Sequence, residues 1–227
     1  MRQFAAVLTF TLMCSLVSLA QNFPAVEVFG GYSYLHVDTQ GIDANSLTLE
    51  CNVIAGGNCP LTFQVHPGFN GFAAAGQFNL NSWFGLKADL NGSYGNIFTA
   101  EINSTLPIPP VNISSPNQHL YDFLFGPVFS HRGRSYTAFA HGLLGGEHIS
   151  FGNIQVSGGF PITLPGPSSE TDFAFALGGG IDFKVTKHFS VRAGEFDYEY
   201  VKSADNGHGH QNDFRYSAGV VVGFGGK

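Results

Sequence analysis

Large apolar residues alternate with small or polar residues in eight segments of this 227-residue chain. A period of two places alternate side chains on opposite faces of a β-strand. The run "LKADLN" at residues 86–91 shows the pattern clearly. We therefore predict eight strands. They lie within residues 25–34, 68–80, 83–94, 120–130, 136–146, 172–184, 189–200 and 214–224.

Two of these segments depart from simple alternation. In residues 136–146 both faces hold apolar residues, so the pattern leaves their orientation open. In residues 189–200 the apolar set shifts by one position at Gly194 and Glu195. One extra residue in a β-bulge would produce this shift.

The connections between the predicted strands alternate in length. Three are short polar stretches around "NS", "HRGRS" and "VTKH", whereas the others span roughly residues 37–67, 95–117, 147–171 and 201–211. Membrane β-barrels have short turns on the periplasmic side and long loops outside. The pattern predicts an all-β, antiparallel, up-and-down barrel with both termini on the side of the short turns.

Composition supports a barrel that faces lipid. Charged residues make up 11% of the chain, against about 25% in ordinary soluble domains, while it holds 30 glycines and 23 phenylalanines. Residues 1–20 have a signal peptide's basic start, apolar run and small residues before the cleavage site. We predict that residues 21–227 form one exported barrel domain. The net charge of −6 argues against nucleic acid as a partner.

The polar face of the predicted strands combines small residues with charges of both signs. This combination suits the inside of a narrow barrel, where buried charges must find partners. A soluble barrel with its apolar face around a ligand is the alternative. The predicted interior charge network consists of Glu27, Lys87, Asp89, Asp122, Asp182, Lys184, Arg192 and Arg215.

The phrases "VEVFGGYSYL", "YDFLFGPVFS", "FALGGGIDFKV" and "NDFRYSAGVVVGF" resemble the small outer-membrane β-barrel proteins of the OmpA/OmpX-like type. The resemblance implies a monomeric eight-stranded barrel among outer-membrane lipids and lipopolysaccharide. It also implies a C-terminal signal for the barrel-assembly machinery, which matches Ser217, Gly219, Val222 and Phe224. The chain departs from the family by continuing to Lys227.

Cys51 and Cys59 remain after signal cleavage, in a segment rich in glycine and asparagine. An exported chain with one close cysteine pair is expected to form a local disulfide. His208 and His210 share a loop, but a third metal ligand is not identifiable. We expect neither a metal nor a cofactor, and we interpret the proline-rich stretch "STLPIPPVNISSPN" as an extended exposed loop.

One short motif raises the alternative of catalysis. His148-Ile149-Ser150 resembles the His-x-Ser of a lipid A deacylase, in which a carboxylate orients the histidine and the histidine activates the serine. Here no carboxylate follows at the family's spacing, and Glu147 would point to the opposite strand face. We therefore predict no catalytic residues. The leading hypothesis is a non-enzymatic outer-membrane protein that supports envelope integrity or surface interaction through four extracellular loops, with an unknown partner.

Replacing Phe224 with Asp should lower the fraction of folded protein in the outer membrane, because it removes the aromatic residue of the assembly signal. Membrane fractionation with heat-dependent gel mobility measures that fraction. Unchanged assembly would contradict the assigned signal.

Overall fold

A computed structural model describes residues 23–39, 61–102, 111–158, 161–202 and 209–225. These residues form thirteen strands, and no helix among them is long and apolar enough to span a membrane. The strands are β1 (Val26–His36), β2 (Leu61–Val65), β3 (Gly68–Asn79), β4 (Phe84–Gly95), β5 (Phe98–Ile102), β6 (Val111–Ser114), β7 (Gln118–Arg132), β8 (Tyr136–Phe151), β9 (Ile154–Ser157), β10 (Ile162–Leu164), β11 (Glu170–Lys184), β12 (Phe189–Lys202) and β13 (Gln211–Phe224).

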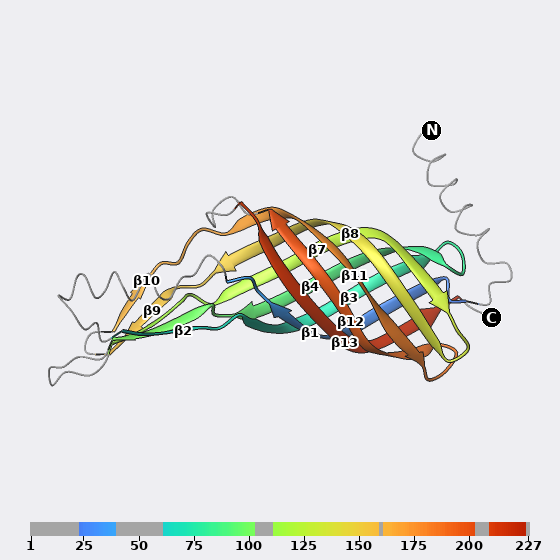
Figure 1. The fold of residues 1–227 in the computed structure, drawn as a ribbon, viewed down its shortest axis with the longest axis horizontal. Coiled ribbons are helices and arrows are strands. Elements are labelled where there is room, and N and C mark those ends of the chain that lie inside the picture. Colours follow the sequence, from blue (N-terminus) through green and yellow to red (C-terminus); the bar gives the residue numbers. More distant parts are fainter. Residues whose placement is uncertain (1–22, 40–60, 103–110, 159–160, 203–208, 226–227) are drawn as a thin grey trace, which may run out of the picture.

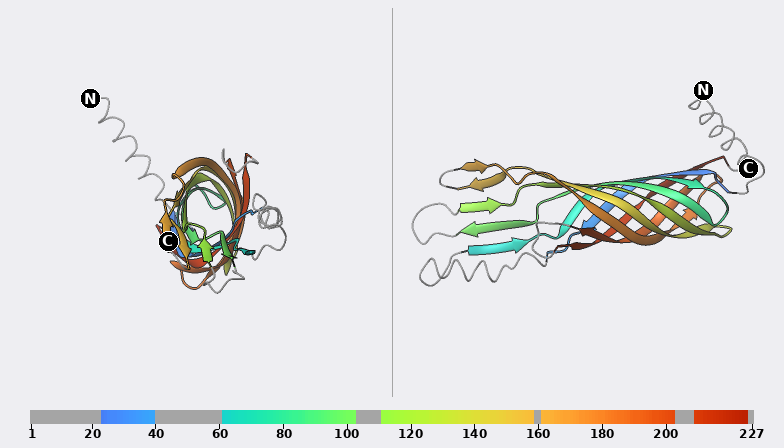
Figure 2. Two further views of the ribbon diagram at one scale, coloured as in Figure 1. Left: turned by 90° about the vertical axis from the view of Figure 1, so that its left-hand side faces the viewer. Right: turned by 90° about the horizontal axis from the view of Figure 1, so that it is seen from above.

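Eight long strands form a closed antiparallel barrel in the order β1-β13-β12-β11-β8-β7-β4-β3 (Figures 1 and 2). The first and last strands close it, with pairing that runs from Val26 opposite Phe224 to His36 opposite Phe214. Closure satisfies the backbone groups of both edge strands. The predicted eight-stranded barrel is thus confirmed.

The two ends of the barrel differ. The connections β3–β4, β7–β8 and β11–β12 are short, and the described termini lie at this end, which we call the turn end (Figure 1). Side-chain oxygens fix two of these turns: Asn81 Oδ1 accepts the backbone N–H groups of Trp83 and Phe84, and Thr186 Oγ1 accepts that of Phe189. The opposite end is the loop end.

Three of the long connections contain strands of their own. The strands β10-β9-β6-β5-β2 pair into one antiparallel sheet beyond the loop end, which we call the distal sheet (Figures 1 and 2). The expectation of an extended loop for the proline-rich stretch is therefore wrong at Val111–Ser114, which is strand β6. The connection predicted at residues 147–171 also begins later, because β8 continues to Phe151.

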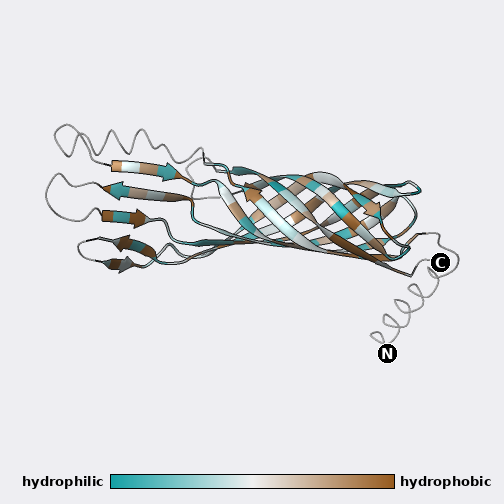
Figure 3. Ribbon diagram, turned by 90° about the horizontal axis from the view of Figure 1, so that it is seen from below, coloured by the Kyte–Doolittle hydropathy of each residue, from teal (hydrophilic) through white to brown (hydrophobic). Residues whose placement is uncertain are grey.

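The faces of the barrel strands follow the predicted assignment. Large apolar side chains on the outside are exposed, such as Phe125 and Leu144, whereas the charged Lys87 and Arg215 on the inside are each 1% exposed. Figure 3 shows the resulting alternation of hydrophobic and hydrophilic residues along the strands. The large apolar residues face outward and the lumen is packed with charged side chains and smaller apolar clusters, so the alternative of a soluble barrel with its apolar face around a ligand is wrong.

The structure defines which side chains point inward in the two segments that depart from simple alternation, residues 136–146 and 189–200. In β8 the inward side chains include Phe139, His141 and Leu143, all buried. In β12 the pairing shifts register between Arg192 and Glu195, as a bulge would require. The shift turns Glu195 inward and lets the following carboxylates join the lumen.

Two adjacent glycines of β1 meet different surroundings. A Cβ atom at Gly31 would lie 2.1 Å from the carbonyl oxygen of Ala218 on β13, whereas nothing lies within 4 Å of one at Gly30. Small residues at Gly31 and its partner Gly219 therefore let the closing strands approach each other.

Replacing Gly31 with Ala should destabilise the folded protein by about 1–3 kcal/mol, because the new methyl group collides with β13. Gly30→Ala is the matched control and should be neutral or slightly stabilising. The urea midpoint of unfolding in detergent micelles measures both. Equal urea midpoints for the two variants would contradict the close approach of β1 to β13 at Gly31.

Candidate functional site

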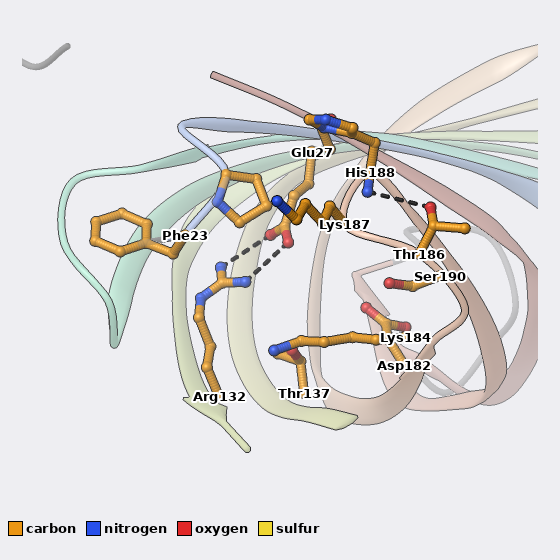
Figure 4. Close-up of a pocket in the computed structure, with 12 residues that line it drawn as sticks. Phe23, Glu27, Arg132, Thr137, Asp182, Lys184, Thr186, Lys187, His188 and Ser190 are labelled. Atoms are coloured by element: carbon orange, nitrogen blue, oxygen red, sulfur yellow. Dashed lines mark hydrogen bonds and ion pairs between the residues drawn. The ribbon is translucent and has the colours of Figure 1, made fainter. Parts of the chain in front are cut away.

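The turn end of the lumen is organised around one acid. Glu27 accepts two hydrogen bonds from Arg132, at 2.9 and 3.0 Å (Figure 4). It also accepts one each from Gln77 and Asn79, both at 3.0 Å. A bidentate arginine–carboxylate pair is a strong and directional contact. It ties β1 to the end of β7, across the barrel mouth.

A pocket of about 310 Å³ lies beside this pair (Figure 4). Lys184 borders it but is exposed, and its Nζ donates to the carbonyl oxygen of Gly133 at 2.8 Å. The structure therefore places Lys184 at the rim, apart from the buried charges with which it was grouped. The pocket is lined by Phe23, Pro24, Glu27, Arg132, Thr137, Asp182, Lys184, Thr186, Lys187, His188, Ser190 and Gly223.

Two buried cations hold the next layer of the lumen. Lys87 Nζ lies 2.6 Å from Asp89 and 2.5 Å from Glu195. Arg192 pairs with Asp182, at 2.7 Å between Nε and Oδ1, and also with Glu195. These contacts join β4, β11 and β12 through charge-assisted hydrogen bonds.

The guanidinium group of Arg192 also lies between two aromatic rings. Its Cζ is 4.3 Å from the ring centroids of both Phe29 and Phe139. Cation–π contacts of this kind are favourable where the cation is desolvated. The apolar residues of the lumen therefore help to hold its charges.

Arg215 is the hub of the central lumen. Its Nη2 lies 2.8 Å from Asp197 and 3.7 Å from Asp89, and its Nη1 lies 2.5 Å from Glu199 and 3.5 Å from Asp122. The side chain is 1% exposed. One cation on β13 thus serves four carboxylates from three other strands, β4, β7 and β12.

Several lumen residues were missing from the predicted network. The buried groups that it omitted are His141, Glu147, Glu195, Asp197, Glu199 and Asp213. The three acids of β12 had a usable signal, because they alternate with Phe196, Tyr198 and Tyr200. The shift predicted at Gly194 and Glu195 turns these acids inward, although the predicted network did not include them.

His141, Glu195 and Asp197 place ligand atoms within 4.8 Å of one another, a spacing that could hold a metal. However, Lys87, Arg192 and Arg215 already contact these acids. His141 Nε2 also lies 2.8 Å from Asp197 Oδ1. The protein's own cations occupy the place of a metal, so the group is a structural ion network.

Other predicted residues lie elsewhere. Residues 1–20, Cys51, Cys59 and His208 are outside the described residues, while the ring of His210 stacks on Tyr200. The assembly-signal residues lie on β13, and Phe224 is exposed on the barrel's outside. Ser217 is buried at the inner face. The role of these four residues as an assembly signal remains a prediction.

The distal sheet has two chemically different faces. Cross-strand pairing aligns apolar residues on one face, including the stacked rings of Phe63 and Phe98, 5.1 Å apart. Polar residues such as Gln64, Thr99 and Ser114 align on the other. The apolar face consists of Leu61, Phe63, Val65, Phe98, Ala100, Ile102, Val111, Ile113, Ile154, Val156, Ile162 and Leu164.

An outward apolar belt, a charged lumen and a closed eight-stranded wall define an integral outer-membrane β-barrel. The family model for the outer membrane protein beta-barrel domain matches residues 5–225, and the chain belongs to this family. The turn end accordingly faces the periplasm and the loop end faces the outside. No curated protein is significantly similar in sequence.

Solved structures of small outer-membrane proteins are similar to this chain. Ail of Yersinia pestis, in complex with the heparin analogue sucrose octasulfate, is 18% identical over 87% of this chain and 97% of its own, with a TM-score of 0.47. OprG of Pseudomonas aeruginosa is 10% identical over 90% and 98%, with a TM-score of 0.47. Neisserial surface protein A is 12% identical over 88% and 97%, with a TM-score of 0.44.

Replacing Arg215 with Met should destabilise the protein by about 3–5 kcal/mol, because four buried carboxylates lose their shared cation. Lys184→Met is the matched control and should change stability by less than about 0.5 kcal/mol, since Lys184 is exposed. Urea unfolding of the detergent-folded protein measures the difference. Similar losses of stability for both variants would contradict the central role of Arg215 in the lumen.

Proposed function

We propose that this protein is a non-enzymatic surface-interaction protein whose distal sheet binds an apolar protein surface outside the cell. The observation that carries the proposal is the amphipathic distal sheet, because a contiguous apolar face outside the membrane is typical of a protein interaction site. The barrel serves as its membrane anchor. Function in loops on a rigid scaffold is a common arrangement.

The exposure of this face is greatest at its edge strand. Ile162 is 52% exposed and Leu164 is 46% exposed, both on β10. Among the described strands, β10 and β2 each pair on one side only. Such edges present unpaired backbone groups to a partner strand. Apolar contacts and backbone pairing therefore both favour a protein partner.

Charge argues against a sulfated polysaccharide as the partner. One similar structure, Ail, is described as a complex with a heparin analogue. In this chain the connections at residues 37–67, 96–117 and 152–169, which include all five strands of the distal sheet, hold no lysine or arginine. Recognition of sulfate groups relies on such cations. The proposal for this chain is therefore apolar recognition.

The geometry around the deacylase-like motif supports a non-enzymatic role. His148 Nδ1 lies 2.7 Å from the hydroxyl of Thr171, where a catalytic triad would place a carboxylate. Glu147 is fully buried and points into the lumen, on the other face of β8. Within the described part of the chain, the partner at His148 Nδ1 is thus a hydroxyl group, whereas a catalytic triad needs an orienting carboxylate there.

Replacing Ile162 and Leu164 together with Asn should reduce adherence of cells to an apolar surface, towards the level of cells that lack the protein. Polar amides at these positions disrupt the apolar face where it is most exposed. Retention of cells on polystyrene and cell-to-cell aggregation measure the effect. Thr163→Asn, on the opposite face of the same strand, should leave adherence unchanged.

Heat-dependent gel mobility verifies that all variants reach the membrane in equal amounts. Entry of a large dye into the same cells tests the envelope-integrity role separately. Loss of the protein that raises dye entry and leaves adherence unchanged would contradict the surface-interaction proposal.

A further inference from the structure

The pocket at the turn end contains two acids that already have partners. Both carboxylate oxygens of Glu27 accept hydrogen bonds from Arg132, at 2.9 and 3.0 Å. Both oxygens of Asp182 accept hydrogen bonds from Arg192, at 2.7 and 3.1 Å. Each negative charge that lines this pocket is therefore matched by an arginine of the barrel.

Two lysines add positive charge to the same pocket. Lys184 ends β11, Lys187 lies in the turn that follows, and both line the pocket (Figure 4). Lys184 Nζ donates one hydrogen bond to the carbonyl oxygen of Gly133, an uncharged partner. Neither lysine forms an ion pair with a described carboxylate, and each ammonium group has three donors. The pocket thus holds two positive charges that no described acid neutralises.

Hydroxyl groups add neutral donors to this lining. Thr186 Oγ1 accepts the backbone N–H groups of His188 and Phe189, at 3.3 and 3.1 Å. Its own hydroxyl hydrogen is left to donate to another group. Thr137 and Ser190 also line the pocket. Charged and neutral donors from β8, β11, β12 and the turn between β11 and β12 therefore surround one opening.

Backbone hydrogen bonds fix the elements that carry these donors. The N–H of Lys184 donates to the carbonyl oxygen of Ser135 at 2.9 Å, which joins the end of β11 to the turn between β7 and β8. The N–H of Gly223 donates to the carbonyl oxygen of His188 at 2.8 Å, which joins β13 to the turn before β12. A site whose backbone is already ordered loses less entropy when a ligand binds.

We propose that this pocket binds a phosphate group on the periplasmic side, with Lys184 and Lys187 as its charged partners and the hydroxyl of Thr186 as a neutral donor. Lysine is a common phosphate ligand, and charge-assisted hydrogen bonds are about twice as strong as neutral ones. A phosphate group offers more acceptor oxygens than a carboxylate, so it suits a pocket with several separate donors. Its source is either free phosphate in the periplasm or the headgroup of a phospholipid in the inner leaflet.

The experiment uses the full mature chain folded in maltoside micelles, whose detergent contains no phosphorus. ³¹P NMR follows inorganic phosphate and phosphatidylglycerol in the same sample, because each compound gives its own signal. At constant ionic strength, the wild type should change at least one of the two signals saturably, with one site per chain. A change of the inorganic signal assigns free phosphate, and a change of the lipid signal alone assigns the headgroup.

Two double variants assign the site. Lys184→Gln combined with Lys187→Gln should weaken the apparent affinity at least about tenfold, because the charged donors are lost. Arg134→Gln combined with Lys202→Gln is the matched control. It removes two positive charges from residues that do not line the pocket, and it should retain wild-type affinity. Heat-dependent gel mobility verifies that all proteins are folded.

Two results would overturn the proposal. One is wild-type protein that changes neither phosphorus signal saturably. The other is equal affinity of the two double variants, which would mean that phosphate is attracted only by the general charge of the protein surface.

Discussion

The structure depends on the pairing of β1 with β13. A lipid bilayer offers no water to unpaired backbone groups, so a membrane sheet must have no edges. Eleven residues of β1 pair without interruption with β13, and the same residues pair with β3 on the other side. Gly31 and Gly219 face each other along this seam. Closure at eight strands then fixes a lumen so narrow that side chains fill it.

A narrow closed wall determines what lies inside. Apolar side chains face the lipid, and the lumen receives small residues together with charged ones. Among the described residues the buried charges are three cations and eight carboxylates. The cations are Lys87, Arg192 and Arg215, and the carboxylates are Asp89, Asp122, Glu147, Asp182, Glu195, Asp197, Glu199 and Asp213.

Charge is also unevenly distributed along the barrel axis. Cations collect at the turn end, where Arg132 and Lys184 end the strands before two short turns and Arg134 and Lys187 lie within those turns. Buried carboxylates lie nearer the opposite end, where Glu147 stands between Asp122 and Asp172 on neighbouring strands. The turn end therefore carries exposed cations around Glu27, whereas the loop-end half holds buried carboxylates such as Glu147 and Asp213.

Sequence reasoning succeeded where one physical rule acts alone. Alternation along β4 and β11 predicts both the strand and its inward face, because lipid outside and charge inside give a strong contrast. It failed where a strand departs from simple alternation, as in β12 and β8. The bulge before Glu195 changed the face of three acids, and β8 placed Phe139 beside His141 in the lumen.

The distal sheet could not be predicted for a different reason. Its strands hold only three to five residues each, as in "LTFQV" and "VNIS", and proline or glycine flanks several of them. Runs this short alternate by chance in any loop. Their pairing joins segments far apart in the sequence, such as Leu61 with Ile102 and Asn112 with Ser157, and local patterns carry no information on such contacts. The position of Glu147 between Asp122 and Asp172 likewise emerges only from the pairing of β7, β8 and β11.

The central claim is that the exposed apolar face of the barrel contacts lipid, and tryptophan fluorescence tests it most directly. Trp83 is the single tryptophan of the chain and is 57% exposed near the turn end. A second protein carries Trp83→Phe with Phe125→Trp, at the middle of β7. In vesicles of brominated lipid, the account predicts strongest quenching of Trp83 by bromines near the headgroups, and of the tryptophan at position 125 by bromines near the bilayer centre. Quenching of both by aqueous iodide, with no effect of brominated lipid, would contradict it.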